Sequence, residues 1–379
     1  MSPLRQNPMY RFLAIMTISS MMGLQTWRTL FDNFAVNMAG LDGNHIGMIQ
    51  SFREIPGFLT LLVVFIIIVI REHRLSALSI FILGLGVAIT GQFASFTGLL
   101  LTTMLMSFGF HYYETTNQSL TLQYFDEDTS PLVFGRLRAI AAAANILVGI
   151  FIYFATELLD YSKIYLLFGS IIMIVGFWGA TRDPSDRNLV AQRKEMVFRK
   201  KYWLYYFLTF MSGARRQIFV AFAVFLLVKK FGFTVQYITT LFVVNNIINY
   251  FLSPFIGKCI VRFGERKMLS LEYASLIFIF LSYAIAVYRW QVALLYILDH
   301  IFFNFAIAIR TYFQKIGDPR DIAPSMAVGF TINHIAAVIL PALGGMLWLV
   351  DYRIPFVCGA AMSIISLLAV QKIKIPERT

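Results

Sequence analysis

The chain has 379 residues, of which 58% are hydrophobic, 16% aromatic and only 14% charged, and its mean hydropathy is +0.70. This apolar share is above that of soluble domains, so the composition excludes a soluble protein and indicates many helices in a bilayer. The formal net charge of +12 does not indicate nucleic acid, whose binders present basic faces on soluble modules.

Apolar runs divide the chain into twelve candidate membrane spans, because a bilayer core of about 30 Å takes about 20 apolar residues per helix. The spans of the first half are 11–38, 45–70, 75–95, 98–122, 132–157 and 161–180. Those of the second half are 203–228, 234–261, 267–288, 290–314, 322–350 and 354–371. The first span has polar residues and no small-residue cleavage pattern after it, so we interpret it as a retained membrane helix.

A long polar stretch at residues 181–201 separates six spans from six. We therefore predict one six-helix half at 1–180, a cytoplasmic linker at 181–202 and a second half at 203–379. A weak internal repeat supports this division, since Gln123 ends span four and Gln314 ends span ten, each before an acidic turn with proline. Two parallel halves of six helices are typical of one class of secondary transporter.

The distribution of Lys and Arg predicts the orientation of the chain. If the N-terminus is cytoplasmic, the cytoplasmic segments hold 22 of these residues and the opposite side holds five. We therefore predict a multi-pass protein of the plasma membrane, of the bacterial inner-membrane type, with both termini cytoplasmic. The basic loops are also expected to contact membrane lipids through anionic headgroups.

The first span carries Gln25, Arg28 and Asp32 at spacings of three and four, so these residues share one helix face. Ionisable residues within the hydrocarbon are costly and usually face a bundle interior or a water-filled cavity. We predict that Gln25 and Arg28 bind substrate and that Asp32 takes part in proton coupling. The structural alternative is an ion pair between Arg28 and Asp32.

The second span contains Arg53 and Glu54, followed by Pro56 and Gly57. Proline removes a backbone donor, so we predict a kink there. Neighbouring residues on a helix point about 100° apart, so one of the charged pair is expected to reach the cavity. Arg53 is a candidate for substrate binding and Glu54 for proton coupling.

The fourth span offers His111 and Glu114 on one face. A carboxyl group in a low-dielectric setting favours its protonated form, as a proton-coupled carrier requires. Glu114 is therefore the first candidate for proton coupling, and His111 is a candidate for substrate binding. A structural ion pair of Glu114 with Arg28 or Arg136 is the alternative.

The seventh span carries Arg215 and Arg216 with no acidic residue in the same span. Two unpaired cations in a membrane are expensive, so their partner must come from another helix or from the substrate. Arginine suits carboxylate and phosphate groups through two parallel hydrogen bonds, which favours an anionic substrate. The competing interpretation pairs the two arginines with Asp299 of span ten and Glu114.

Spans ten and eleven supply further candidates, with Asp299, Asn304 and Asn333 for substrate binding and His300 for proton relay. A lone buried histidine is more often a structural residue. The charged residues within spans are Arg28, Arg53, Arg215, Arg216 and Arg310 against Asp32, Glu54, Glu114, Glu272 and Asp299. Five against five permits complete internal pairing.

A basic loop after span eight contains Gly257, Arg262, Gly264, Arg266 and Lys267. Gly257 would allow close helix approach, and Gly264 would make the tight turn. This spacing resembles the basic loop motif of the major facilitator superfamily (MFS). The resemblance implies two six-helix halves that rock about a central site, with span one lining the cavity and this loop acting at the gate.

The chain departs from that family in several places. Val261 occupies the acidic position of the loop motif, and the arginine motif of span four and the antiporter signature of span five are missing. The resemblance therefore implies fold and transport without specifying a substrate. The sequence also has no phosphate-binding GxxxxGK loop and no catalytic constellation, so we expect no enzyme activity, cofactor or metal, and a monomer.

These observations favour a proton-coupled secondary active transporter of a small organic anion, working by alternating access. The alternative function is a proton-driven efflux antiporter for an amphipathic or cationic compound, which would use the same carboxylates and the aromatic content. A third hypothesis is a sensor or assembly factor that kept the fold without transport.

Overall fold

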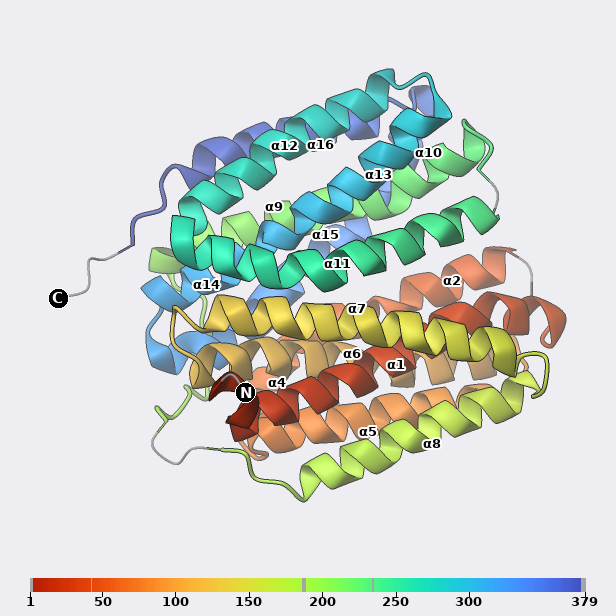
Figure 1. Cartoon of the computed structure of the whole chain (residues 1–379), viewed down its shortest axis with the longest axis horizontal. Coiled ribbons are helices and arrows are strands. Elements are labelled where there is room, and N and C mark those ends of the chain that lie inside the picture. Colours follow the sequence, from red (N-terminus) through yellow and green to blue (C-terminus); the bar gives the residue numbers. More distant parts are fainter. Residues whose placement is uncertain (1–2, 42, 186–188, 234, 376–379) are drawn as a thin grey trace. The chain divides into compact units, whose positions relative to one another are not determined.

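The computed structural model describes residues 3–41, 43–185, 189–233 and 235–375, and all regular elements in these ranges are helical (Figure 1). The elements of the first half are η1 (Pro3–Gln6), α1 (Pro8–Asn37), α2 (Gly43–Arg53), α3 (Ile55–Phe58), η2 (Leu59–Leu62), α4 (Val63–Ile66), α5 (Glu72–Thr90), α6 (Phe96–Tyr124), α7 (Ser130–Ala155) and α8 (Tyr161–Ala180). Those of the second half are η3 (Lys200–Tyr202), α9 (Trp203–Ile218), η4 (Phe219–Ala223), α10 (Val224–Lys229), α11 (Val235–Phe263), α12 (Glu265–Ile285), α13 (Arg289–Phe303), η5 (Asn304–Ala306), α14 (Ile307–Ile316), η6 (Pro319–Asp321), α15 (Ile322–Val350) and α16 (Ile354–Val370).

Eight helical stretches of the described chain are long and apolar enough to cross a membrane. The other four predicted spans are helical as well: α1, α6 and α15 have 30, 29 and 29 residues, and α9, η4 and α10 follow one another without a break. The predicted all-helical fold with twelve spans is therefore confirmed. The predicted start of the eighth span, residue 234, lies outside the described residues.

The predicted kink in the second span is confirmed, because α2 ends at Arg53 and Pro56 opens a chain of short turns, α3, η2 and α4. Backbone groups near this break form hydrogen bonds with a side chain of α15. The Thr331 hydroxyl donates to the Phe58 carbonyl at 2.9 Å and accepts from the Leu61 amide at 3.0 Å. Broken helices are tolerated in a membrane where side chains satisfy the freed backbone in this way.

The chain forms two compact units. Unit 1 contains residues 1–124, 140–197 and 319–331, and unit 2 contains 125–139, 198–318 and 332–379. Each unit therefore includes a short segment from the opposite end of the sequence. The Gln314 amide shows this in unit 2, since it donates to the Phe125 carbonyl at 2.6 Å and accepts from the Ser130 hydroxyl at 2.5 Å.

Unit 1 is held together by glycines where α5 contacts α6 and α8, which lie alongside it (Figure 1). A Cβ atom at Gly169 of α8 would lie 2.3 Å from the Ala88 amide nitrogen of α5. At Gly109 of α6 it would lie 2.3 Å from the Leu83 amide nitrogen of α5. Small residues drive helix association in membranes because they let backbones approach closely, so these positions set the spacing of the three helices.

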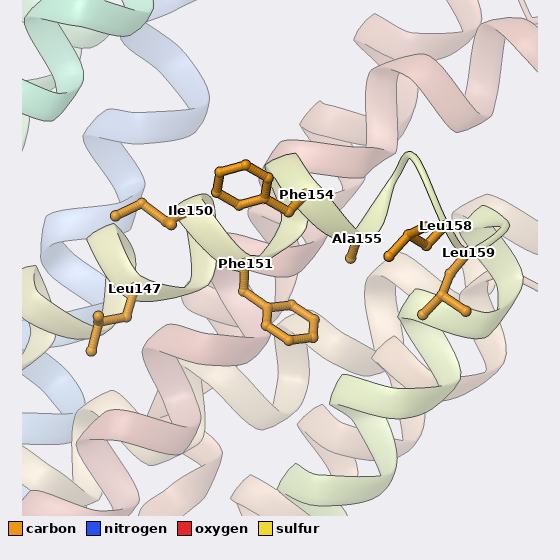
Figure 2. A pocket seen from close by; sticks show the side chains of 7 residues that line it. All are labelled: Leu147, Ile150, Phe151, Phe154, Ala155, Leu158 and Leu159. Carbon is orange, nitrogen blue, oxygen red and sulfur yellow. The ribbon is translucent and has the colours of Figure 1, made fainter.

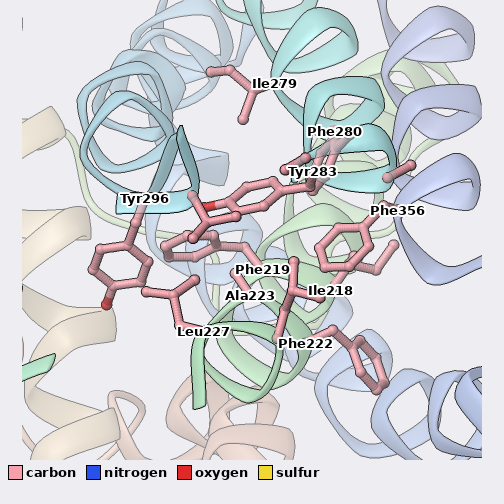
Figure 3. Close-up of a cluster of buried hydrophobic side chains, with 14 of the residues drawn as sticks. Ile218, Phe219, Phe222, Ala223, Leu227, Ile279, Phe280, Tyr283, Tyr296 and Phe356 are labelled. Carbon is pink, nitrogen blue, oxygen red and sulfur yellow. The ribbon is translucent and has the colours of Figure 1, made fainter. Parts of the chain in front are cut away.

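Unit 2 packs with large side chains instead. Figure 3 shows an apolar cluster built from α9, η4, α10, α12, α13 and α16. Phe280 of α12 lies against Gly359 of α16, and Tyr283 stacks on Phe356 with ring centroids 5.1 Å apart. The cluster excludes water from the interior of unit 2, which raises the cost of any charge buried beside it.

The segment after the sixth span binds the start of α15, and both belong to unit 1. The Gln192 side chain donates to the Pro319 carbonyl at 2.8 Å and accepts from the Ala323 amide at 2.9 Å. The Arg193 amide donates to the Arg320 carbonyl at 2.8 Å. The Ala323 amide is one of the donors that a helix start leaves without an intrahelical partner, and the Gln192 side chain satisfies it.

Asp321 forms the charged part of this attachment, since its fully buried carboxylate lies 2.7 Å from Nε of Arg193. We expect Asp321→Ala to lower the stability of the protein by about 2 kcal/mol, because it leaves Arg193 without this charge-assisted contact. Limited proteolysis should then cut residues 189–199 faster. Asp183→Ala is the control, because that carboxylate is 46% exposed and its pair with Arg71 contributes at most about 1 kcal/mol. Equal protease resistance of the two variants would contradict the expectation.

Candidate functional site

Unit 1 has a polar face along α6. The helix carries a long series of buried polar side chains: Thr102, Thr103, Ser107, His111, Thr115, Thr116, Asn117, Gln118, Ser119 and Thr121. Several of the hydroxyls bond to the carbonyl one turn earlier, as Thr115 does with His111 at 2.9 Å. Thr103 and Ser107 instead bond to groups of α1 and α2, so α6 is the element around which the polar group of unit 1 is organised.

The predicted site residues of α2 and α6 meet in the structure. The Ser107 hydroxyl donates to the Arg53 carbonyl and lies 2.9 Å from Nδ1 of His111. Arg53 contacts the Glu54 carboxylate at 2.6 Å, and these side chains are 21% and 22% exposed. Half-buried charges of this kind line an accessible polar surface, in contrast to those of a dry core.

Trp27 of α1 completes this group and was not among the predicted site residues. Its indole nitrogen donates to the Thr103 hydroxyl at 3.1 Å, and the Arg53 guanidinium lies 5.3 Å from the ring centroid. A cation over an indole ring is attracted by the ring quadrupole, which fixes the orientation of Arg53. An aromatic residue one position before Arg28 was the only sequence signal, and it is weak in a chain with 16% aromatic residues.

The remaining predicted residues of unit 1 lie at more open positions. Arg28 and Asp32 are exposed on α1, and Gln25 donates to the Thr29 hydroxyl at 3.1 Å. Glu114 is half-buried on α6, one turn from His111. The sequence spacing thus placed Gln25, Arg28 and Asp32 along one helix, but the group around Ser107 and Trp27 depends on contacts between helices.

Arg215 and Arg216 on α9 have opposite environments. Arg216 is exposed, whereas Arg215 is fully buried in unit 2. Arg215 donates a hydrogen bond to the Ser366 hydroxyl of α16 and lies over the ring of Tyr273 on α12, 4.3 Å from its centroid. Its Nη2 is 3.8 Å from Oε1 of Glu272. Arg215 is therefore enclosed within unit 2, whereas the side chain of Arg216 is exposed.

Asp299 of α13 also lies inside unit 2. It is 0% exposed and interacts electrostatically with Glu272 and Arg215. The interpretation that paired Arg215 with Asp299 anticipated this neighbourhood, but Glu272 was counted as an in-span charge without a role. The sequence signal for Glu272 was the same as for the other in-span carboxylates: an acidic residue within an apolar span.

The other predicted site residues of unit 2 lie on α13, in the turn η5 and on α15. The His300 ring lies 3.1 Å from the Tyr296 carbonyl and edge-on to Phe219. Asn304 donates to the Asn249 side chain at 2.6 Å, at the point where α13 gives way to the 3₁₀ turn η5. Asn333 is half-buried and donates to the Thr209 carbonyl at 3.3 Å.

The basic loop joins α11 to α12. Gly264 has a φ of +80°, a conformation that favours glycine, and it immediately precedes α12. A Cβ atom at Gly257 would lie 2.4 Å from the Pro131 carbonyl oxygen, within unit 2. Arg266 donates to the Gln371 side chain at 3.2 Å, while Arg262 and Lys267 are exposed.

A hollow of about 560 Å³ lies at the end of α7 and the start of the turn to α8 (Figure 2). The side chains that line it are all apolar: Leu147, Ile150, Phe151, Phe154, Ala155, Leu158 and Leu159. A substrate site needs a few placed polar groups to fix orientation. This hollow offers none among its lining residues, so it fits the acyl chains of the surrounding lipid.

A helical membrane protein of two compact units with polar faces is the class that these features define. The sequence profile described as Major Facilitator Superfamily matches residues 10–323. The chain therefore belongs to the major facilitator superfamily, and its apolar helices are those of a multi-pass membrane protein.

Known proteins are similar to this chain at low identity. Multidrug resistance protein 1 of Bacillus subtilis (strain 168) is 24% identical over 203 residues, which is 52% of this chain and 51% of that protein. The alignment thus spans about half the length of that relative. The structure of the human organic anion transporter MFSD10 (TETRAN) has a TM-score of 0.77 at 11% identity, covering 98% of this chain and 100% of that one. A bacterial homologue of the iron transporter ferroportin, outward-facing, has a TM-score of 0.78 at 12% identity, covering 96% and 98%.

Proposed function

We propose that this transporter moves a small organic anion by alternating access, coupled to protons. The carrying observation is the unequal burial of the charges within the spans. Arg215, Glu272 and Asp299 are each 0% exposed. One of five arginines and two of five carboxylates are therefore enclosed in unit 2, which leaves four arginines against three carboxylates at more open positions. This excess of one positive charge favours an anionic substrate.

Arg216 is the leading candidate for anion contact, since it is exposed on α9 while its neighbour is engaged within unit 2. Arg28 and Arg53 are the corresponding candidates of unit 1. Two guanidinium donors suit a carboxylate or phosphate in the substrate. Gln25, His111, Asn304 and Asn333 would supply neutral hydrogen bonds, so charge sets the substrate class and these groups refine its shape.

Proton coupling is assigned to carboxylates that are neither fully exposed nor enclosed. Glu54 is 22% exposed beside Arg53, and Glu114 is half-buried on the polar helix α6. Such groups can exchange protons with water, and a nearby charge still shifts their protonation equilibrium. Asp32 and His300 are the further candidates. The basic loop at Gly257, Gly264 and Lys267 is proposed to act at the gate.

The alternative is proton-driven efflux of an amphipathic or cationic compound, which the relative named as a multidrug resistance protein favours. In unit 1, Glu54 lies next to Arg53, which covers Trp27, and Trp27 stacks on Phe31 with centroids 4.4 Å apart. An acid beside stacked aromatic rings suits a hydrophobic cation. In this case the excess arginines would be structural.

The membrane of residence is proposed to be a plasma membrane of the bacterial inner-membrane type, with both termini cytoplasmic. The unequal distribution of Lys and Arg, 22 against five, supports this orientation. The protein is proposed to work as a monomer.

The test is uptake into proteoliposomes of a panel of organic anions and cations, with and without an imposed pH gradient. We expect gradient-dependent anion uptake that falls about tenfold or more in Arg216→Ala, because a charged hydrogen bond contributes about 1.5–3 kcal/mol. Arg182→Ala is the matched control. Arg182 is exposed, lies just after the end of α8 and packs over the Trp178 ring. Gradient-driven flux of cations alone would refute the anion proposal and establish the alternative.

A further inference from the structure

Unit 2 encloses a charged group that no helix packing requires. Arg215 of α9, Glu272 of α12 and Asp299 of α13 are all 0% exposed, and Ser366 of α16 closes the group. We call these four residues the buried charge cluster. Its position, between α9 and the pair α12 and α16, corresponds to the contact of α1 with α5 and α8 in unit 1.

The corresponding contact in unit 1 is apolar around Gly23. A Cβ atom at Gly23 of α1 would lie 2.2 Å from Leu83 of α5 and 3.2 Å from Ile172 of α8. Glycine and aliphatic side chains are therefore sufficient to pack the first helix of a half against its third and sixth. Charges at this place in unit 2 are expensive by comparison, which indicates a role beyond packing.

The carboxylates of the cluster lack the hydrogen bonds that buried ions need. Among the residues that the structure describes, neither oxygen of Glu272 nor of Asp299 has a hydrogen-bond partner. The buried cation of the cluster, Arg215, is 3.8 Å from Glu272 at its nearest approach. Two carboxylates beside one guanidinium carry a net negative charge unless one of them holds a proton.

Among the described residues, the further cation that acts on Glu272 is an exposed arginine. Tyr273 and Tyr283 of α12 are the neighbouring titratable hydroxyls, and Arg138 of α7 acts on Glu272 from an exposed position. The apolar cluster of Figure 3 draws on the same helices, since Ile279 follows Glu272 on α12 and Tyr296 precedes Asp299 on α13. Apolar walls make an unneutralised carboxylate costly, so a shared proton is the low-energy state.

A second buried acid on the same helix shows the contrast. Glu265, at the start of α12, is also 0% exposed, but its carboxylate lies 2.8 Å from the Lys315 ammonium. One acid with one cation is neutral without a proton. The difference between Glu265 and Glu272 is therefore charge balance, not burial.

Helices α9 and α13 each bring one charged residue to the buried charge cluster. Each helix passes into an irregular turn within five residues of that charge. Four residues beyond Arg215, α9 passes into the π-helical turn η4 (Phe219–Ala223). Five residues beyond Asp299, α13 passes into the 3₁₀ turn η5 (Asn304–Ala306). Such turns often mark functional sites or hinges, because their hydrogen bonds are less regular than those of an α-helix.

We propose that Glu272 and Asp299 together bind one proton in the interior of unit 2, and that its loss displaces α9 and α13 at η4 and η5. Deprotonation leaves two buried carboxylates that repel each other, and separation of α13 from α12 relieves this repulsion. The proton transfers to water without any other reactant. Because α9 also carries Arg216, and α13 also carries His300 just before Asn304, the protonation state would reposition the candidate substrate residues.

The test is infrared spectroscopy of the purified protein without substrate, following the carbonyl stretch of protonated carboxyl groups in H₂O and D₂O. We expect the wild type to show such a band near neutral pH and to lose it as the pH rises. Glu272→Gln and Asp299→Asn should each remove the band, since the remaining carboxylate then balances Arg215. Glu265→Gln is the matched control and should keep it.

Hydrogen exchange tests the second step and does not depend on transport. At a pH above the loss of the band, the wild type should exchange faster than Glu272→Gln at residues 219–223 and 304–306. A wild type without the band, or a band that survives both substitutions, would overturn the proton site. The wild-type titration decides this even if a variant fails to fold. Equal exchange in the two proteins would overturn the hinge movement, whereas failure of anion uptake would refute only the proposed function.

Discussion

Arg215→Met is expected to destabilise the protein by about 3–5 kcal/mol, because it removes the one cation beside two buried carboxylates. Arg215 also stacks on Tyr273 and donates to Ser366, so the substitution removes three contacts at once. Methionine has a similar length and no charge, which limits the change to electrostatics and hydrogen bonding. The measurement is the midpoint of unfolding of the purified protein in detergent.

The control for this substitution is Arg216→Met, an exposed neighbour on the same helix. Its effect on stability should stay within about 0.5 kcal/mol. A triple variant, Arg215→Met with Glu272→Gln and Asp299→Asn, should recover most of the loss, because replacing a complete buried ionic group is often nearly neutral. A triple variant as unstable as Arg215→Met alone would show that packing, not charge, sets the effect.

Gly169→Ala is expected to cost about 3 kcal/mol in stability, because an added carbon overpacks the contact of α8 with α5. The added Cβ would lie 2.3 Å from the Ala88 amide nitrogen and 2.4 Å from its Cα. These are backbone atoms, so no side-chain rotation relieves the overlap and α5 must move away from α8. That movement also loosens the contact of Gly176 with Phe81 on the same helix pair.

Gly149→Ala is the matched control for Gly169→Ala. Gly149 lies on α7, and a Cβ there would meet no heavy atom of the described residues within 4 Å. Alanine is the better helix former by up to about 1 kcal/mol, so this variant should be as stable as the wild type or slightly more so. If both variants lost stability equally, the close approach of α5 and α8 would not be the cause.

Local sequence pattern was sufficient to predict the membrane helices and the breaks between them. The break of the second span follows from Pro56 alone, and the turn at Gly264 follows from a glycine between two apolar runs. Both are properties of one or a few residues, so the chain's neighbours in space do not change them. The twelve spans follow likewise from the length of apolar runs against the bilayer thickness.

The weak internal repeat shows that sequence pattern does not predict the contacts of a residue. Gln123 and Gln314 occupy matching places in the sequence, but Gln123 donates to Glu72 and Ser119 at 2.7 Å. Gln314 instead joins the segment that begins at Phe125 to unit 2. Equivalent positions thus make different contacts, because the partners come from segments that sequence spacing does not relate.

By itself, the sequence determined that this protein is a twelve-span membrane protein with charged residues in its spans, because hydropathy and helix periodicity act over a few turns. Only the tertiary structure decided which of those charges are enclosed. Arg215 and Arg216 are adjacent and chemically identical, yet one is buried against Glu272 and the other is exposed. The physical reason is that burial depends on which helices pack on each side of α9, and the cost of a charge depends on that packing.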